Sequence, residues 1–325
     1  MEQVDTRSLL VVLVVLALGC AAQAAPARDG STACPGPPIV FEPLAADLWL
    51  IPARAEVADA DNRGQVVNLL LARQGARVWL LGSGPSPAFG RALACQAQQR
   101  LGLRVTDLAV PRARAELALG AAGLPAARAW TTPAVRDAMR VQCPTCVRHL
   151  RQRMGSAALD LAAQPVRLPE HSLHGSHGSW GPFEWRQWRL DRSTVTTVWR
   201  HRGADVVAGF GVLWFGAPPD GRDTDIDRLA RTVASVLDHT TPATRFVGEQ
   251  GSVGRRDAVQ HQLAYWNLIL SQAAVGVARG DTLAAAPLPA DVDWAAHERH
   301  GLNWQRAWRQ AEDRFLALPA PRRSP

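Results

Sequence analysis

The stretch that decides the fold is RVWLLGSGP, residues 77–85. Its run from Arg77 to Leu81 is short and apolar, and glycines follow at once, which is typical of a buried β-strand that ends in a sharp turn. Residues 88–101 then space their apolar side chains as an amphipathic helix does. A strand that passes through a glycine turn into a helix predicts a mixed α and β architecture.

The same signals recur on both sides of this stretch. We expect further strands at 47–53, 65–71, 103–110, 128–130, 166–168, 183–190, 194–199, 205–208 and 244–247. Helices are expected at 133–155, behind a Thr132 N-cap, and at 223–237, 257–277 and within 294–316. Strand-rich and helix-rich stretches occur once on each side of a Gly/Ser/His loop near residue 175. This order predicts an α+β protein in which two sheets pack face to face with helices outside, a four-layer αββα sandwich.

The first 24 residues have the pattern of a secretory signal peptide. Arg7 precedes an apolar run at 9–18, and small residues follow it. The motif AQA at 22–24 fits simple cleavage, ALGC at 17–20 fits a lipoprotein leader that ends before Cys20, and an uncleaved anchor is the third alternative. We expect an exported, periplasmic protein that meets a membrane only through this leader or a lipid anchor. A flexible lead (25–40), a main domain (41–293) and a helical tail (294–325) would follow.

All 36 basic residues are arginine, and the formal net charge is +7. A guanidinium stays charged at any relevant pH and favours bidentate contacts with carboxylate or phosphate. The arginines are scattered among acidic residues, without a basic stripe or a nucleic-acid motif, so we expect no nucleic-acid partner.

Removal of the leader would leave four cysteines, Cys34, Cys95, Cys143 and Cys146. An even number in an oxidising compartment predicts disulfides. Cys143 and Cys146 have the spacing of a thiol redox motif, but no thioredoxin-like pattern surrounds them. We therefore favour a structural disulfide, within this motif or to Cys34 or Cys95. His171, His174 and His177 are either a metal site or, as we prefer, an exposed insertion.

Several motifs resemble the metallo-β-lactamase superfamily over nearly the whole mature chain. They are GQVVNLLL at 64–71, VWLLGSG at 78–84, VVAGF at 206–210 and GEQG at 248–251. Within that superfamily, SGPS at 83–86, CPTC at 143–146 and HGLN at 300–303 resemble the exported branch of quinoprotein relay system zinc metallohydrolases. The resemblance implies the sandwich fold, a zinc-dependent hydrolase site, and a role beside a quinoprotein dehydrogenase.

The residues at the zinc-ligand positions depart from that pattern. Where the superfamily has His-x-His-x-Asp-His, this chain has Arg112, Arg114, Glu116 and Leu117. The later ligand positions fall on Leu190-Asp191-Arg192, Phe210 and Gln250. An arginine does not lose its proton to bind a cation. We therefore expect neither zinc, nor another cofactor, nor a catalytic residue at this position.

Two interpretations of the altered site follow. Arg112, Arg114 and Glu116 alternate by two and would share one face of an extended backbone. Together with Asp191 and Gln250 they form either an internal ion-pair network or a site for a small anionic ligand. The preferred function is a non-catalytic accessory or binding protein with a protein partner in a periplasmic quinoprotein pathway. The alternative is a hydrolase with a remodelled active site.

Overall fold

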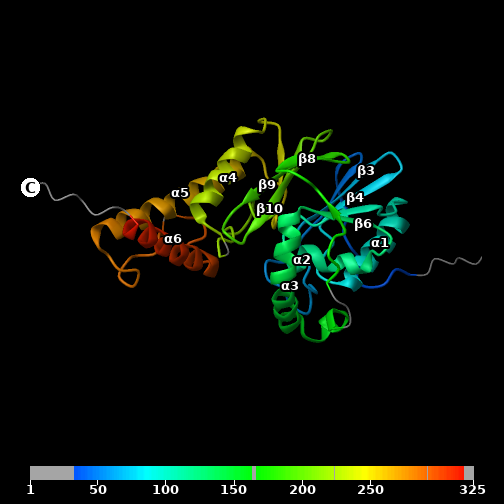
Figure 1. Cartoon of the computed structure of the whole chain (residues 1–325), viewed down its shortest axis with the longest axis horizontal. Helices are drawn as coiled ribbons and strands as arrows, with labels where there is room; N and C mark the ends of the chain where they lie inside the picture. The colour runs from blue at the N-terminus through cyan, green and yellow to red at the C-terminus, as the bar shows by residue number, and fades with distance from the viewer. Residues whose placement is uncertain (1–32, 163–165, 223, 291, 318–325) are drawn as a thin grey trace, which may run out of the picture. The chain divides into compact units, whose positions relative to one another are not determined.

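The computed structural model describes residues 33–162, 166–222, 224–290 and 292–317 (Figure 1). Two β-sheets face each other, with helices on the outer side of each, so the predicted four-layer αββα sandwich is confirmed. The predicted leader, with Cys20, lies outside the described residues.

The first sheet has seven strands in the order β1-β2-β3-β4-β5-β6-β7. Strands β1 to β4 pair antiparallel, and β4 to β7 pair parallel. Its strands are β1 (Glu42–Ala45), β2 (Leu48–Ile51), β3 (Leu69–Gln74), β4 (Arg77–Leu81), β5 (Asp107–Ala109), β6 (Arg128–Thr131) and β7 (His171–Ser172).

The second sheet has five strands in the order β12-β11-β10-β9-β8. All neighbours pair antiparallel except β11 and β12, which are parallel. Its strands are β8 (His177–Trp180), β9 (Phe183–Arg189), β10 (Val195–His201), β11 (Val206–Gly209) and β12 (Arg245–Gly248).

The helices begin and end where local chemistry dictates. The Ser86 hydroxyl accepts from the Phe89 N–H (3.1 Å) at the start of α1, and Gly102, with φ of 68°, ends it. Thr132 and a first-turn proline start α3 as predicted. The helices are α1 (Pro87–Leu101), α2 (Ala115–Ala118), α3 (Pro133–Met154), α4 (Ile226–Asp238), α5 (Arg256–Arg279) and α6 (Glu298–Leu316), with 3₁₀ turns at Leu119–Gly123 and Gly155–Ala162.

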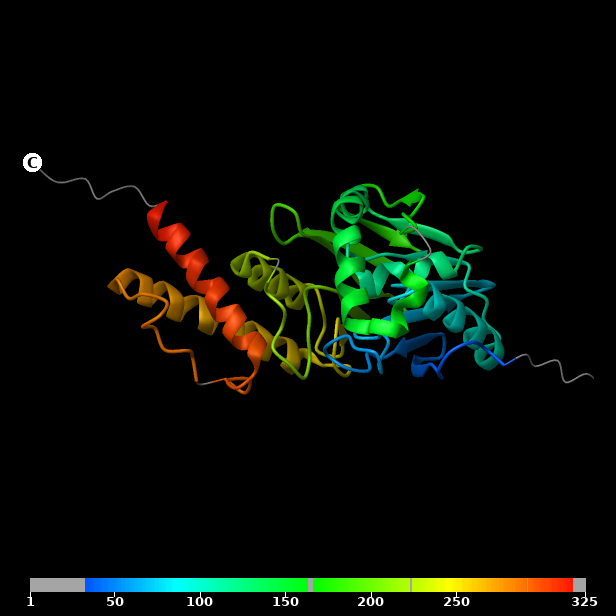
Figure 2. The ribbon, with the colours of Figure 1, turned by 90° about the horizontal axis from the view of Figure 1, so that it is seen from below.

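Two large apolar clusters hold the layers together. One fills the space between the sheets, with Leu50 and Leu71 from the first and Phe183 and Trp199 from the second. The other packs the outer face of the second sheet against α4, α5 and α6, of which α5 and α6 lie side by side (Figure 2). Trp185 belongs to the first cluster, whereas Trp188 packs against the second, as expected for side chains three apart on one strand.

Some predicted elements differ from the structure. Residues 166–168, expected as a strand, have no regular structure. The apolar Val66 and Val67 are buried without being part of β3, which begins at Leu69. Apolar runs report burial, and burial alone does not distinguish a packed loop from a strand.

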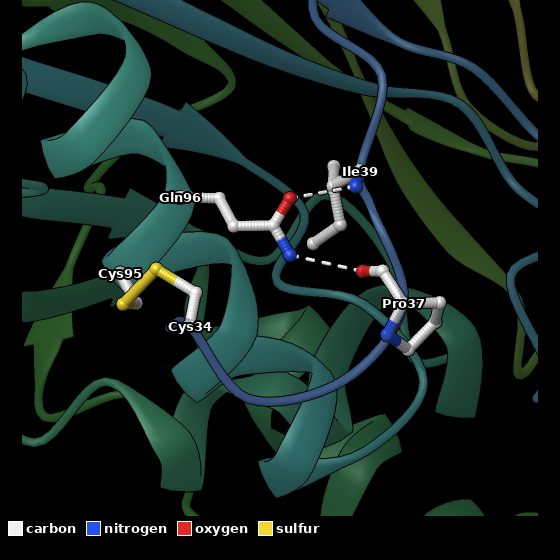
Figure 3. Close-up of a disulfide and its surroundings, with 5 residues drawn as sticks. All are labelled: Cys34, Pro37, Ile39, Cys95 and Gln96. Atoms are coloured by element: carbon white, nitrogen blue, oxygen red, sulfur yellow. Dashed lines mark hydrogen bonds between the residues drawn. A yellow bond between two sulfur atoms is a disulfide. The ribbon is translucent and has the colours of Figure 1, made fainter. Parts of the chain in front are cut away.

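A disulfide joins Cys34 to Cys95 on α1 (Figure 3). Beside it, the Gln96 side-chain amide accepts from the Ile39 N–H (2.7 Å) and donates to the Pro37 carbonyl (2.9 Å). Residues 34–39 of the lead are thereby held against α1. The expectation that Cys143 belongs to a disulfide is wrong, because it is a buried thiol within α3. Its neighbour Cys146 also stays outside the bridge.

No helix in the described ranges is both long and apolar enough to cross a membrane.

The Cys34–Cys95 bridge closes a loop with a sequence separation of 61 residues. We expect the Cys34→Ala/Cys95→Ala variant to lose about 4 kcal/mol of unfolding free energy, because the bridge restricts the unfolded chain. Urea denaturation of the variant and the oxidised parent measures the loss. The reduced parent is the control and should match the variant, whereas equal stability of all three would contradict the prediction.

Candidate functional site

The loop that follows β5 carries Arg112 and Arg114, the arginines at the expected metal-ligand positions. Arg112 forms an isolated antiparallel bridge with Thr196 of β10, and the Pro111 carbonyl accepts from both the N–H (3.0 Å) and the hydroxyl (2.9 Å) of Thr197. The loop therefore starts in the first sheet and is fixed to the second. This places Arg112 where the two sheets meet.

A buried carboxylate, Glu249, holds both arginines. Arg112 Nη1 lies 3.2 Å from Glu249 Oε2, and Arg114 Nη1 pairs with Glu249 Oε1. The Glu249 side chain has no exposed surface, while the two arginines are 13% and 20% exposed. Burial of a charge is tolerated when it is paired, and here one carboxylate is paired twice. The result is an ion-pair network between the 112–116 loop and the turn after β12.

Glu249 was missed by the sequence reasoning. The sequence pattern places the expected ligand position at Gln250 of the GEQG turn, whereas the residue that pairs with the arginines is Glu249. The signal was available, because Glu249 is the acidic residue beside Gln250 and an acid is the natural counterion for two arginines.

The backbone between Arg112 and Glu116 is extended only in part. Arg114 has extended dihedral angles, but it is the N-cap of α2, which puts Glu116 in the first helical turn. The expectation that all three side chains share one extended face is therefore wrong for Glu116. The two still meet, with Arg114 Nε 3.1 Å from Glu116 Oε2. A carboxylate in the first turn also suits the positive end of a helix.

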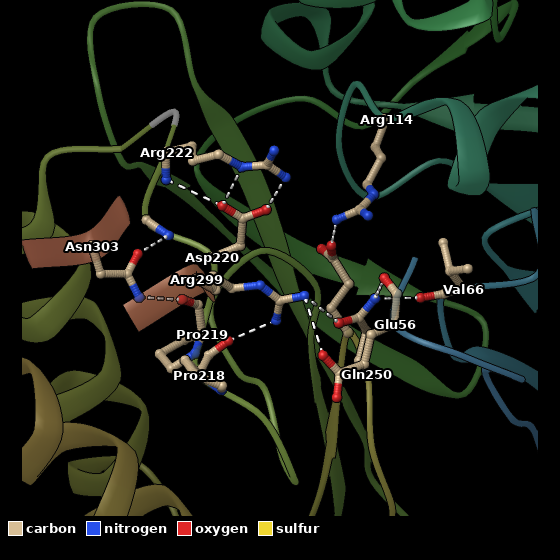
Figure 4. Close-up of polar contacts among 12 residues, drawn as sticks. Glu56, Val66, Arg114, Pro218, Pro219, Asp220, Arg222, Gln250, Arg299 and Asn303 are labelled. Carbon is tan, nitrogen blue, oxygen red and sulfur yellow. Dashed lines mark hydrogen bonds and ion pairs between the residues drawn. The ribbon is translucent and has the colours of Figure 1, made fainter. Parts of the chain in front are cut away.

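Gln250, next to Glu249 in the sequence, takes part in a second set of contacts (Figure 4). Its amide nitrogen donates to the carbonyls of Val66 (2.8 Å) and Glu56 (2.9 Å), and its oxygen accepts from Arg299 Nη2 at 3.4 Å. Arg299 comes from α6 and also donates to the Pro218 carbonyl (2.6 Å). Gln250 thus links the turn after β12 to the chain before β3 and to α6.

Two other sequence-predicted positions make different contacts. Asp191 contacts Arg306 of α6, with 3.3 Å between Oδ2 and Nη2. Phe210 is buried in the apolar core, and its carbonyl accepts from the Thr196 hydroxyl at 2.5 Å. The structure therefore joins Arg112 and Arg114 through Glu249 and Arg114 to Glu116, while Asp191 pairs with Arg306.

Gly211 leaves the space that the Arg112 guanidinium occupies. Its φ is 74°, and a Cβ there would lie 2.3 Å from Arg112 Nη1. Any other residue would be strained by the backbone angle and would meet the guanidinium. The turn after β11 is thus adapted to an arginine side chain.

A cavity of about 620 Å³ opens over the arginine pair. Its polar wall is formed by the 112–116 loop, by Thr145, Cys146, His149 and Arg153 of α3, by Ser193 and Thr194, and by Asp220, Arg222 and Thr224.

The acids of the cavity are ionised at neutral pH. Burial raises the pKa of Glu116, but the charge and hydrogen bonds of Arg114 outweigh this effect and leave the pKa below its usual value. Burial likewise raises the pKa of Asp220, and the stronger opposing contacts of Arg222 lower it overall. Arg222 binds Asp220 through two nitrogens, at 3.0 and 2.7 Å (Figure 4). Groups of this kind act as counterions and do not serve as general acids near pH 7.

Cys143 is not activated as a nucleophile. Burial, followed by the nearby Cys146, raises its pKa to about 12. The reactive form of cysteine is the thiolate, so Cys143 is an inert core thiol.

The three histidines near residue 175 do not converge on one point. His171 stacks on Trp130 with 4.5 Å between ring centroids, and His177 lies beside Ser176 at the start of β8. Within the described ranges, no group of three or more His, Cys, Asp or Glu side chains could hold a metal ion.

The residues at the expected zinc position do not fit zinc. Two guanidiniums stand where imidazoles would be required, and they would repel a divalent cation. The nearby carboxylates Glu116 and Glu249 are already engaged by these guanidiniums. We therefore derive no metal chemistry from this site.

Comparison with known proteins shows the fold. No family model matches the sequence, and no curated protein does. Two solved structures that match are a metallo-β-lactamase from Hirschia baltica and one from Erythrobacter litoralis with β-mercaptoethanol in the active site. Each has a TM-score of 0.57 and is 12% identical in sequence to this chain. Each match covers 71% of this chain, together with 98% of the Hirschia baltica protein and 96% of the Erythrobacter litoralis protein. This chain has the metallo-β-lactamase fold.

Glu249→Gln keeps the side-chain shape but removes the charge that pairs both arginines. We expect it to cost about 3–5 kcal/mol of unfolding free energy, because two partly buried guanidiniums lose the charge of Glu249. Urea denaturation at pH 7 measures the change.

The control for this substitution is Asp47→Asn. Asp47 pairs with Arg73 at 2.6 Å, but both side chains are nearly half exposed. A surface pair of this kind contributes up to about 1 kcal/mol. Equal losses in the two variants would show that Glu249 is not a structural centre.

Proposed function

We propose that this chain is a non-catalytic binding protein that holds a small anion, a carboxylate or phosphate, in the cavity over Arg112 and Arg114. The observation that carries the proposal is the pair of guanidiniums, Arg112 and Arg114, held on one buried carboxylate in the wall of this cavity. A site that presents fixed cations favours ligands of the opposite charge.

The charge of the cavity supports an anionic ligand. The cavity still has an excess of one positive charge when Glu249, which lies behind the wall, is counted. Its lining carries Arg112, Arg114, Arg153 and Arg222, against the carboxylates of Glu116, Asp220 and Glu249. Hydroxyl groups of Thr145, Ser193, Thr194 and Thr224 stand in the same wall. Guanidinium forks and hydroxyls together are suited to the oxygens of a carboxylate or phosphate. The cavity volume is also in the range of small-molecule sites.

The biological setting that we propose is an accessory role in an exported quinoprotein dehydrogenase system. Its support is the resemblance of residues 83–86, 143–146 and 300–303 to that branch and the leader-like pattern of residues 1–24. In this role the chain would deliver or retain an anionic ligand for a periplasmic protein partner. No turnover is needed for such a task.

The alternative proposal is a hydrolase with a remodelled site. It is favoured by one observation, namely that Cys146 and His149 of α3 both line the same cavity. A thiol and an imidazole are the elements of nucleophilic catalysis. This alternative predicts turnover that a thiol reagent abolishes.

Metal analysis and a hydrolysis panel separate the two proposals. For the purified mature protein we expect less than about 0.1 zinc per chain and no hydrolysis of thioester, lactone or β-lactam substrates, because the donor set does not suit zinc. Stoichiometric zinc with chelator-sensitive turnover would contradict the binding-protein proposal. Turnover lost on thiol alkylation would instead support the remodelled hydrolase.

Anion binding is tested by calorimetric titration with citrate and pyrophosphate at low salt. We expect Arg153→Gln to weaken binding by about three- to tenfold, because it removes one charge-assisted contact from an exposed wall. The matched control is Arg151→Gln, an exposed arginine of the same helix that does not line this cavity. Equal weakening in both variants, or no binding by the parent, would contradict the proposal.

A further inference from the structure

A second cavity, of about 410 Å³, lies at the other end of the first sheet. Its wall includes Arg77, Trp79, Arg128, Trp130, His174 and Trp180. The 112–116 loop follows the carboxyl end of β5, whereas this cavity lies near Asp107, the first residue of β5. The two cavities are thus separated by the length of the parallel strands.

Strand register places the wall residues in rows. Trp79, Asp107 and Arg128 are direct neighbours across β4, β5 and β6, and Trp130 pairs with His171 of β7. Arg77 is two residues before Trp79, and Trp130 is two residues after Arg128. Because side chains two apart on a strand share a face, arginines and tryptophans alternate over one patch of one sheet face. We call this set, Arg77, Trp79, Asp107, Arg128 and Trp130, the Arg–Trp patch.

One carboxylate is shared by two arginines in this patch. Asp107 is fully buried, and its Oδ1 lies 2.8 Å from Arg77 Nη2 and 2.9 Å from Arg128 Nη2. The Trp130 indole nitrogen donates to the same oxygen at 3.1 Å. Two guanidiniums against one carboxylate leave an excess of positive charge. Both are oriented before any ligand arrives, which lowers the entropy cost of binding.

The arginines of the patch remain open to solvent. Their side chains are 43% and 49% exposed, in contrast to those of Arg112 and Arg114. The Arg77 guanidinium carbon lies 4.1 Å from the centre of the Trp79 ring, and that of Arg128 lies 5.9 Å from the Trp130 ring. These are cation–π contacts, in which the ring also extends the apolar wall beside the charge.

Two hydrogen-bond donors of the wall residues have no acceptor. The indole nitrogens of Trp79 and Trp180 are buried and have no hydrogen-bond partner among the described residues. Buried donors are normally satisfied, so two such donors in the wall of one cavity mark it as a place short of an acceptor. A ligand oxygen entering with a small ring shift would supply one.

We propose that this cavity binds a planar aromatic carboxylate. Its carboxylate group would lie between Arg77 and Arg128, and its ring would pack against the indoles of Trp79, Trp130 and Trp180. Guanidiniums select the carboxylate, the aromatic wall selects the ring, and the volume suits a small molecule. His174 at the exposed rim would face the ligand, which gives one member of the histidine series a role without a metal. This site is independent of the anion cavity over Arg112.

The probe is indole-3-carboxylate, titrated into the full mature protein by calorimetry, with the neutral indole-3-carboxamide as the ligand control. We expect saturable binding of the acid and none of the amide. Arg128→Gln should weaken binding by about tenfold or more, because one charge-assisted contact is lost. Arg77 keeps both of its contacts with Asp107 in this variant, so the fold should be retained.

Two control variants make the result specific. Arg73→Gln removes the same charge from a similarly exposed, salt-bridged arginine of neighbouring β3, and Arg153→Gln alters only the other cavity. Both should bind within about twofold of the parent.

Three outcomes would overturn the proposal. The first is that binding of indole-3-carboxylate does not saturate by about 5 mM, and the second is that Arg128→Gln binds it as the parent does. The third is that Arg153→Gln, and not Arg128→Gln, loses binding. The last would assign the acid to the cavity over Arg112. Failure of citrate binding with retained indole-3-carboxylate binding would contradict the proposed function alone.

Discussion

The buried carboxylate of Glu249 is the interaction on which the rest of the site depends. It belongs to the turn after β12, and both of its arginines come from the loop after β5, so one charge joins the two sheets of the sandwich. Neighbouring contacts support the same junction, since the Asn68 amide donates to the carbonyls of Gly248 and Gly251 at 2.9 Å. A metal ion would join these segments through its ligands. Here they are joined by an ion pair that survives burial only because it is complete.

Ion pairing between guanidiniums and carboxylates determines what the site can do. A guanidinium has no lone pair to offer a metal and no proton to give at neutral pH, but it presents several N–H donors in a fixed plane. The acids around it are held ionised by their arginine neighbours, as the lowered pKa values of Glu116 and Asp220 show. Neither proton transfer nor Lewis-acid chemistry follows from such a set. Recognition of an anion does, because the donors are already oriented and the cavity above them is open.

The sequence predicted the parts of this molecule that local chemistry determines. Residues 77–81 and the start of α3 at Pro133 were placed correctly, because a glycine turn and an N-cap followed by proline act over a few residues. The partner of Arg112 was not predictable in the same way. Glu249 lies 137 residues away, and whether it or Gln250 faces the loop depends on how the turn after β12 is oriented. The same limit applies to Glu116, whose neighbour Arg114 could have continued an extended strand and instead caps a short helix. A pattern in sequence gives residue types at a site, while the choice between adjacent side chains is made by tertiary packing.

The same chemical unit occurs twice in this fold, and solvent exposure separates its two uses. Glu249 and Asp107 are both fully buried, and each is shared by two arginines. Around Glu249 the arginines are mostly buried and tied to opposite sheets, so the unit holds the sandwich together. Around Asp107 they are nearly half exposed and come from strands of one sheet that backbone hydrogen bonds already hold. The structure needs only one of those two cations to balance Asp107, and the second adds charge at a surface lined with indoles. The second cation is already oriented and has no carboxylate of its own, so it can pair with an anion that arrives from solution. The Asp107 unit is therefore better suited to binding a ligand than to stabilising the fold.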